Sequence, residues 1–259
     1  MITRADTKTT SSSTSAQAHA AEGSRAQALD ALRGAALVWM AIFHFCFDLS
    51  HYGLLRANFY EDAWWTTQRT CILSLFLLCA GAGQAIAVAE RQTWARFWRR
   101  WRQIAGCALL VSVGSYLMFP DSYIYFGVLH GMALMLVLAR LGAGLGAWLP
   151  VAGSVIIYLP HAVQSTFFDT RATDWVGLVT HKPITEDYVP LLPWLGVMLW
   201  GLWGMQELLR RRPQVLRVTL PRMLRPLSLL GRWSLTFYMT HQLVLIGGLE
   251  LFMMWRQGR

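Results

Sequence analysis

Apolar stretches alternate with short polar connections along most of the chain. A helix needs about 20 residues to cross the hydrocarbon core of a bilayer, and each of these stretches approaches that length. The stretches cover approximately residues 33–50, 70–89, 103–119, 123–139, 144–160, 190–209 and 227–254. The pattern predicts an all-α fold: a polytopic integral membrane bundle of about seven transmembrane helices, forming one domain over residues 27–259.

Two polar segments flank or interrupt this pattern. Residues 1–26 are rich in Ser, Thr and Ala and contain no apolar run, so a disordered tail is expected there. The connection over about residues 161–189 is the longest one and carries several charged side chains. Long polar loops are often functional, and we expect this one to face outward.

The composition supports a membrane protein, because 55% of the residues are hydrophobic and only 14% are charged. The net charge of +9 raises the possibility of nucleic-acid binding, but the basic residues form short clusters between apolar stretches, such as RFWRRWR at 96–102. Most of these clusters fall on one side if the N-terminus is cytoplasmic, as the positive-inside rule requires. We therefore expect a cytoplasmic N-terminus, a lipid bilayer as partner and no nucleic acid.

The first apolar stretch has a polar face. Arg33, His44, Asp48 and His51 follow one another at offsets of 11, 4 and 3 residues, which places them within about 60° on a helix. Ionisable residues at membrane depth are costly and usually functional. A carboxylate one turn beyond an imidazole can accept its hydrogen bond and orient it. His44 and Asp48 are therefore candidate functional residues.

Two further histidines, His130 and His241, lie at the same membrane depth as His44 if each helix rises regularly from its expected side. If their helices meet, the three histidines lie close together in the outer half of the membrane. Two classes of protein fit these residues: histidines at one depth suit a haem-binding membrane protein, and a His44–Asp48 relay suits a proton-coupled transporter. No metal is expected, because the four cysteines all lie in predicted spans without a CxxC pair.

Three parts of the sequence carry a family resemblance. They are ALDALRGAALVWMAIFHFCFDLSHYG from residue 28, YIYFGVLHGMAL from residue 123, and PWLGVMLWG followed by LLGRWSLTFYMTHQLVLIG. They resemble bacterial members of the heparan-alpha-glucosaminide N-acetyltransferase catalytic-domain family, within the broader group of transmembrane acyltransferases. An arginine, ten residues and a histidine, here Arg33 and His44, also resemble the signature of that group. One departure is Leu243, where the family has a proline soon after His-Gln.

The resemblance implies an acetyl-CoA-dependent enzyme that moves an acetyl group from the cytoplasm to a sugar amine or hydroxyl on the outer side of the membrane. It implies that His44, oriented by Asp48, is catalytic and that Arg33 belongs to the donor site. In such a reaction His130 and His241, if their helices meet that of His44, could contact the acceptor or donate hydrogen bonds to the oxyanion that develops on the acetyl group. We therefore expect a multi-pass acyltransferase of the bacterial inner membrane, with acetyl-CoA as acyl donor and a glycan or glycolipid as acceptor. The identity of the acceptor and the oligomeric state, including a homo-oligomer, are left open.

Overall fold

The computed structural model describes residues 27–217 and 220–257, so the tail expected over residues 1–26 lies outside the described residues. The described chain is helical and contains no strand, which confirms the predicted all-α class. The helices are α2 (Gln27–His51), α3 (Ala63–Ala89), α4 (Trp94–Met118), α5 (Val128–Gly142), α6 (Leu149–Ala162), α7 (Leu191–Arg211), α8 (Arg225–Arg232) and α9 (Ser234–Gln257). Short 3₁₀ helices link several of them: η1 (Ala143–Trp148), η2 (Thr166–Phe168), η3 (Asp174–Val176), η4 (Pro213–Arg217) and η5 (Arg222–Leu224).

Four helical segments of the described chain are long and apolar enough to cross a membrane: Gln27–His51, Ala63–Ala89, Val128–Leu145 and Ser234–Arg256. Each predicted stretch coincides with a helix, but α4 begins with a basic segment and α6 has only 14 residues. The last stretch is divided, because α8 ends before α9 begins at Ser234. The membrane class is thus supported, while seven spans and a cytoplasmic N-terminus stay predictions.

Glycines allow three helix pairs to pack backbone against backbone. A Cβ atom on Gly34 of α2 would lie 1.9 Å from the Leu227 carbonyl oxygen of α8. A Cβ on Gly81 of α3 would lie 2.0 Å from the Met198 carbonyl oxygen of α7, and Gly196 of α7 approaches α6 in the same way. Small residues at such contacts are typical of helix pairs in membranes.

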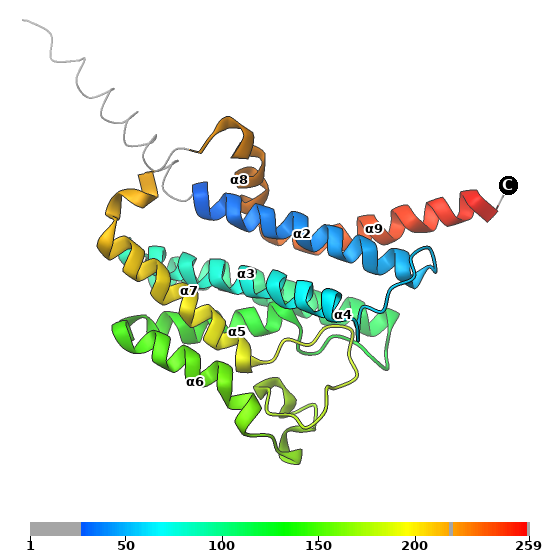
Figure 1. Ribbon diagram of the computed structural model, residues 1–259, viewed down its shortest axis with the longest axis horizontal. Helices are drawn as coiled ribbons and strands as arrows, with labels where there is room; N and C mark the ends of the chain where they lie inside the picture. Colours follow the sequence, from blue (N-terminus) through cyan, green and yellow to red (C-terminus); the bar gives the residue numbers. More distant parts are fainter. Residues whose placement is uncertain (1–26, 218–219, 258–259) are drawn as a thin grey trace, which may run out of the picture.

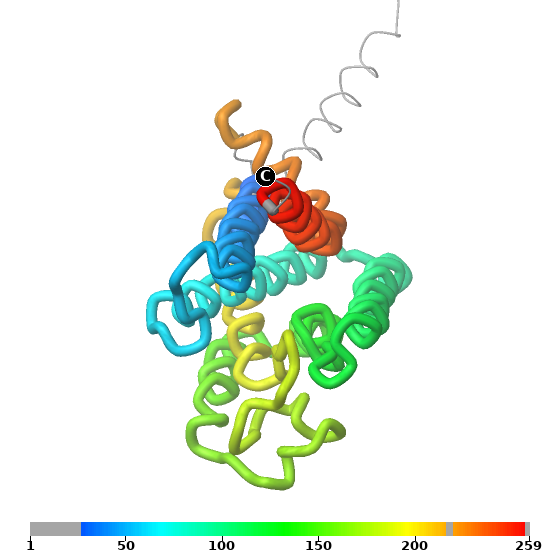
Figure 2. Tube along the Cα trace, turned by 90° about the vertical axis from the view of Figure 1, so that its right-hand side faces the viewer, coloured from blue at the N-terminus to red at the C-terminus, as the bar shows by residue number. Residues whose placement is uncertain are grey.

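The main core lies between α3, α5 and α7, where Leu77, Met135 and Met198 are fully buried. In Figure 1, α2 and α9 form a layer above α3, and α5 and α6 lie below it. The end-on view in Figure 2 confirms that α2 and α9 lie side by side and that α3 separates α2 from α5. The first and last helices of the described bundle therefore form one layer of their own.

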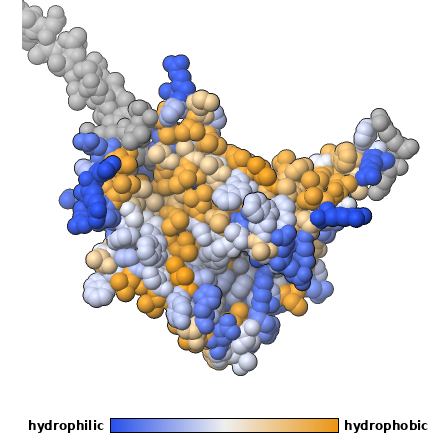
Figure 3. Space-filling view, in the orientation of Figure 1, coloured by the Kyte–Doolittle hydropathy of each residue, from blue (hydrophilic) through white to orange (hydrophobic). Residues whose placement is uncertain are grey.

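Large apolar side chains of α4 and α9 point away from the protein. Leu109 and Leu117 of α4 and Leu243, Val244 and Leu251 of α9 are each about two-thirds exposed or more. Figure 3 shows the hydrophobic surface over α9 and hydrophilic residues at the left edge, near the end of α7. These faces have the composition expected of contact with lipid.

Candidate active site

Helices α2 and α9 bring two of the predicted histidines into contact. The His44 ring on α2 and the His241 ring on α9 meet edge to face, with 5.2 Å between centroids and an interplanar angle of 65°. These residues are 197 positions apart in the sequence, and their shared membrane depth was the only signal that linked them. The edge-to-face contact leaves no room for a haem between the rings, which counts against the bis-histidine alternative.

Asp48 is buried, at 5% exposure, and is held by Gln242, which was not among the predicted site residues. Both carboxylate oxygens accept hydrogen bonds from Nε2 of Gln242 on α9, at 2.8 and 3.1 Å. No hydrogen bond joins Asp48 to His44 in the described structure, so the expected His44–Asp48 pair is replaced by an interhelical one. The adjacency of Gln242 to His241 was the only available clue. The proton-relay alternative, which depended on the direct pair, loses its geometric support.

His241 is also buried, at 8% exposure, and its orientation is fixed by two contacts. Its Nδ1 atom donates a hydrogen bond to the Tyr238 carbonyl oxygen at 2.8 Å. Its ring stacks on Phe237, with 5.7 Å between centroids and an interplanar angle of 9°. Nε2 of His241 is buried and has no hydrogen-bond partner among the described residues.

His130 is engaged elsewhere, with both ring nitrogens occupied. Nδ1 accepts from the Gly127 backbone N–H at 3.3 Å, at the start of α5. Nε2 lies 3.1 Å from Oγ of Ser112 on α4, which itself donates to the Ile124 carbonyl oxygen at 2.7 Å. His130 makes no contact with His44 or His241 in the described chain, and α3 lies between α5 and α2. The structure therefore does not bring the third predicted histidine into the site.

Arginines from three helices gather at the other end of α2. Arg33 pairs with Asp30 one turn earlier, with 2.9 Å between Nη1 and Oδ1. Arg100 of α4 and Arg232 of α8 are close enough to interact electrostatically with the same carboxylate. Arg96 interacts in the same way with Arg100. One carboxylate therefore faces several guanidinium groups, and we call this set the arginine cluster: Arg33, Arg96, Arg100 and Arg232.

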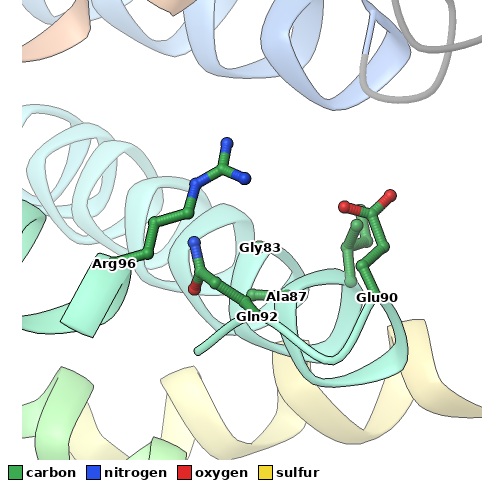
Figure 4. Close-up of a pocket in the computed structure, with 6 residues that line it drawn as sticks. Gly83, Ala87, Glu90, Gln92 and Arg96 are labelled. Carbon is green, nitrogen blue, oxygen red and sulfur yellow. The ribbon is translucent and has the colours of Figure 1, made fainter. Parts of the chain in front are cut away.

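A small pocket opens beside this cluster, between the end of α3 and the start of α4 (Figure 4). It has a volume of about 190 Å³ and contains Arg96 of the arginine cluster. The other lining residues are Gly83, Ile86, Ala87, Glu90 and Gln92. The Arg96 guanidinium and the Glu90 carboxylate point toward the same side of the pocket in Figure 4. A polar entrance thus exists at the end of the bundle where Arg33 lies.

The connection between α6 and α7 is ordered by contacts with the segment before α5. The Tyr188 hydroxyl donates to the Asp174 carbonyl oxygen at 2.7 Å, and the Tyr125 hydroxyl donates to the Asp174 carboxylate at 2.5 Å. Asp187 accepts from the Val128 backbone N–H at 2.7 Å, and burial raises the pKa of this carboxyl group. Asp187 is also within electrostatic range of Tyr238, one turn before His241 on α9. The end of this loop therefore lies near the histidine pair.

The described residues include no group of three or more His, Cys, Asp or Glu that could hold a metal ion.

A family model described as heparan-alpha-glucosaminide N-acetyltransferase, catalytic, matches residues 25–243. No curated protein and no solved structure matches the chain. The matched range includes Arg33, His44 and the His241–Gln242 pair, and it confirms the resemblance noted in the sequence. The chain belongs to the heparan-alpha-glucosaminide N-acetyltransferase catalytic-domain family.

Proposed function

We propose that the protein is a membrane-embedded acetyltransferase that moves the acetyl group of cytoplasmic acetyl-CoA to a sugar amine or hydroxyl on the opposite side of the membrane. Membership of the family supports acetyl transfer to a glycan. The observation that carries the finer proposal is the arrangement along α2. The arginine cluster lies at one end of the helix, and the His44–His241 pair lies toward the other.

The arginine cluster suits the donor. Guanidinium groups bind phosphate oxygens through paired, charge-assisted hydrogen bonds, and acetyl-CoA carries its phosphates at the end remote from the thioester. Arg33 and His44 are separated by about 16 Å along the helix, a distance that the extended pantetheine arm would cover. Arg33 is therefore assigned to the donor site, with the pocket beside Arg96 as the cytoplasmic entrance.

His44 and Asp48 are assigned to catalysis, and His241 to contact with the acceptor. Asp48 lies one turn from His44 on the same helix and bonds to Gln242 of α9 rather than to the imidazole, so it fixes α9 beside His44. His44 removes the acceptor proton or takes up the acetyl group itself. His130 receives no role in the transfer, because its Nδ1 atom caps the start of α5 and its Nε2 atom contacts Ser112 of α4.

The acceptor side is assigned to the loop between α6 and α7, whose Asp187 approaches α9. A glycan or glycolipid would enter from this end, and the bacterial inner membrane provides the two compartments that the reaction needs. The bilayer and the two substrates are the partners of this proposal, and no metal takes part in it.

The test uses purified full-length protein, acetyl-CoA labelled on the acetyl group and a pool of bacterial glycans. His44→Ala should reduce release of CoA by about 100-fold or more, the usual contribution of a positioned acid–base group. The matched control is His161→Ala, which removes an exposed histidine at the end of α6 and should leave the rate unchanged. Equal rates for wild type and His44→Ala, or no binding of acetyl-CoA, would refute the proposal.

A further inference from the structure

The hydrogen bonds of His241 determine which of its nitrogens carries the proton. A backbone carbonyl oxygen can only accept, so the Tyr238 contact at 2.8 Å requires an N–H at Nδ1. In the neutral ring, Nε2 then has a free lone pair and cannot donate. An unprotonated Nε2 is therefore unsuited to hold an oxyanion, which was one of the two roles expected of His241.

The same lone pair is placed where a proton acceptor is needed. Nε2 is buried without a partner among the described residues, although buried polar atoms are normally hydrogen-bonded. The Phe237 stack prevents free rotation of the ring, and the His44 ring is in edge-to-face contact with it. An oriented, desolvated proton acceptor, Nε2 of His241, thus lies beside His44.

His44 lacks the features that would make it the better base. Asp48, the only carboxylate one turn away on its helix, has both oxygens bonded to Gln242. Among the described residues, His44 therefore has no carboxylate or carbonyl hydrogen-bonded to its ring that would fix its tautomer, whereas His241 has a carbonyl in that role. Histidines that act as bases typically have the second ring nitrogen held by such a group.

We propose that His241 is the general base of the transfer reaction, an assignment that rests on the proposed function. As the acceptor nitrogen or oxygen attacks the thioester carbonyl carbon, its proton passes to Nε2 of His241 and the new C–N or C–O bond forms. The C–S bond then breaks, CoA leaves as a thiolate, and the His241 imidazolium returns the proton to the sulfur. This assignment replaces both roles considered for His44 above: His44 neither removes the acceptor proton nor takes up the acetyl group, and it contacts the acetyl group during this step.

The first experiment measures the tautomers by ¹⁵N NMR of protein labelled at its histidine side chains. His241 should carry its proton on Nδ1 at neutral pH, with Nε2 unprotonated. His130 is an internal control of the opposite kind, because its contacts with Gly127 and Ser112 require an N–H at Nε2. Signals are assigned by their loss in His241→Gln and His130→Gln. A proton on Nε2 of His241 would overturn the assignment without touching the proposed function.

The second experiment separates proton acceptance from hydrogen bonding. His241→Gln places an amide near the former Nε2 position, where it accepts a hydrogen bond but takes no proton. Turnover should fall by about 100-fold or more, acetyl-CoA affinity should stay within about threefold of wild type, and the acid limb of the pH–rate profile should disappear. Added imidazole should partly restore the rate of His241→Ala.

The outcomes distinguish the two proposals. If His241→Gln releases CoA at the wild-type rate with an unchanged pH profile, the assignment of the base is overturned and the proposed function is not. A wild-type protein that releases no CoA in a His44-dependent manner overturns the proposed function, and the assignment of His241 falls with it.

Discussion

Replacing Gln242 by Ala should weaken the attachment of α9 to α2. The substitution removes the only side chain that donates hydrogen bonds to Asp48 in the described structure, and it leaves that carboxylate at 5% exposure. The backbone and the His241 contacts are preserved, because the change shortens one side chain without altering the helix. The perturbation therefore tests one interhelical contact.

The magnitude follows from the burial and charge of Asp48. A hydrogen bond to a charged group contributes about 1.5–3 kcal/mol, and a buried charge without a partner costs about 3–5 kcal/mol. Asp48 can limit this cost by taking up a proton, so we expect a loss of about 2–3 kcal/mol in the free energy of unfolding. For a chain of this size the loss corresponds to a fall of about 4–12 °C in melting temperature.

The assay is thermal unfolding in detergent of Gln242→Ala, Asp48→Ala and the double variant. The double variant should be clearly more stable than the sum of the single losses predicts, because removal of both groups leaves no stranded carboxylate. Gln68→Ala on α3 is the matched control. It removes an exposed hydrogen bond from Trp39, which lies on α2 as Asp48 does, and it should cost less than about 1 kcal/mol. Strictly additive losses would show that Gln242 and Asp48 are not coupled.

Three further predictions concern other parts of the molecule. Gly34→Ala should destabilise the protein by about 1–3 kcal/mol, because the new methyl group meets the α8 backbone. Gly106→Ala is the control and should leave the stability unchanged, because its methyl group meets nothing within 4 Å. Thermal unfolding of the two variants measures the difference. Arg33→Gln should raise the KM for acetyl-CoA about tenfold or more while changing kcat less, and a selective fall in kcat would place Arg33 outside the donor site. Hydrogen bonds from Thr180 lower the pKa of Asp169 below its usual 3.8, so this carboxylate stabilises the loop fully above about pH 4 and loses that effect as the pH falls through the lowered value. Hydrogen exchange of residues 165–181 should therefore accelerate in acid for wild type, and Thr180→Ala should remove most of that dependence.

The sequence predicted the helices well, because hydrophobic length is a direct requirement of a bilayer. It also placed His44 and His241 at one depth, since helical rise per residue is nearly constant. Depth says nothing about which helices are neighbours. His130 was misplaced for that reason: α5 is on the far side of α3, and its histidine caps the first turn of its own helix.

The partner of Asp48 could not be predicted for a related reason. Periodicity on α2 indicates that His44 and Asp48 share a face, and a direct pair between them was therefore expected. The structure shows that α9 presents His241 to the first and Gln242 to the second. Contacts between two helices depend on their rotation and separation, which here follow from close packing at glycines such as Gly34, and no local pattern records them.

The Asp48–Gln242 hydrogen bond joins α2 to α9, and the two residues are 194 positions apart. The other described helices are all encoded between α2 and α9. At synthesis rates of about 5–20 residues per second, α2 waits about 10–40 s in the membrane before α9 is made. During that interval the nascent chain already has Arg33 but lacks the second imidazole and the amide that holds the carboxylate. A ribosome-bound or prematurely terminated chain would therefore lack the His44–His241 contact, and the candidate site is complete only when synthesis reaches α9.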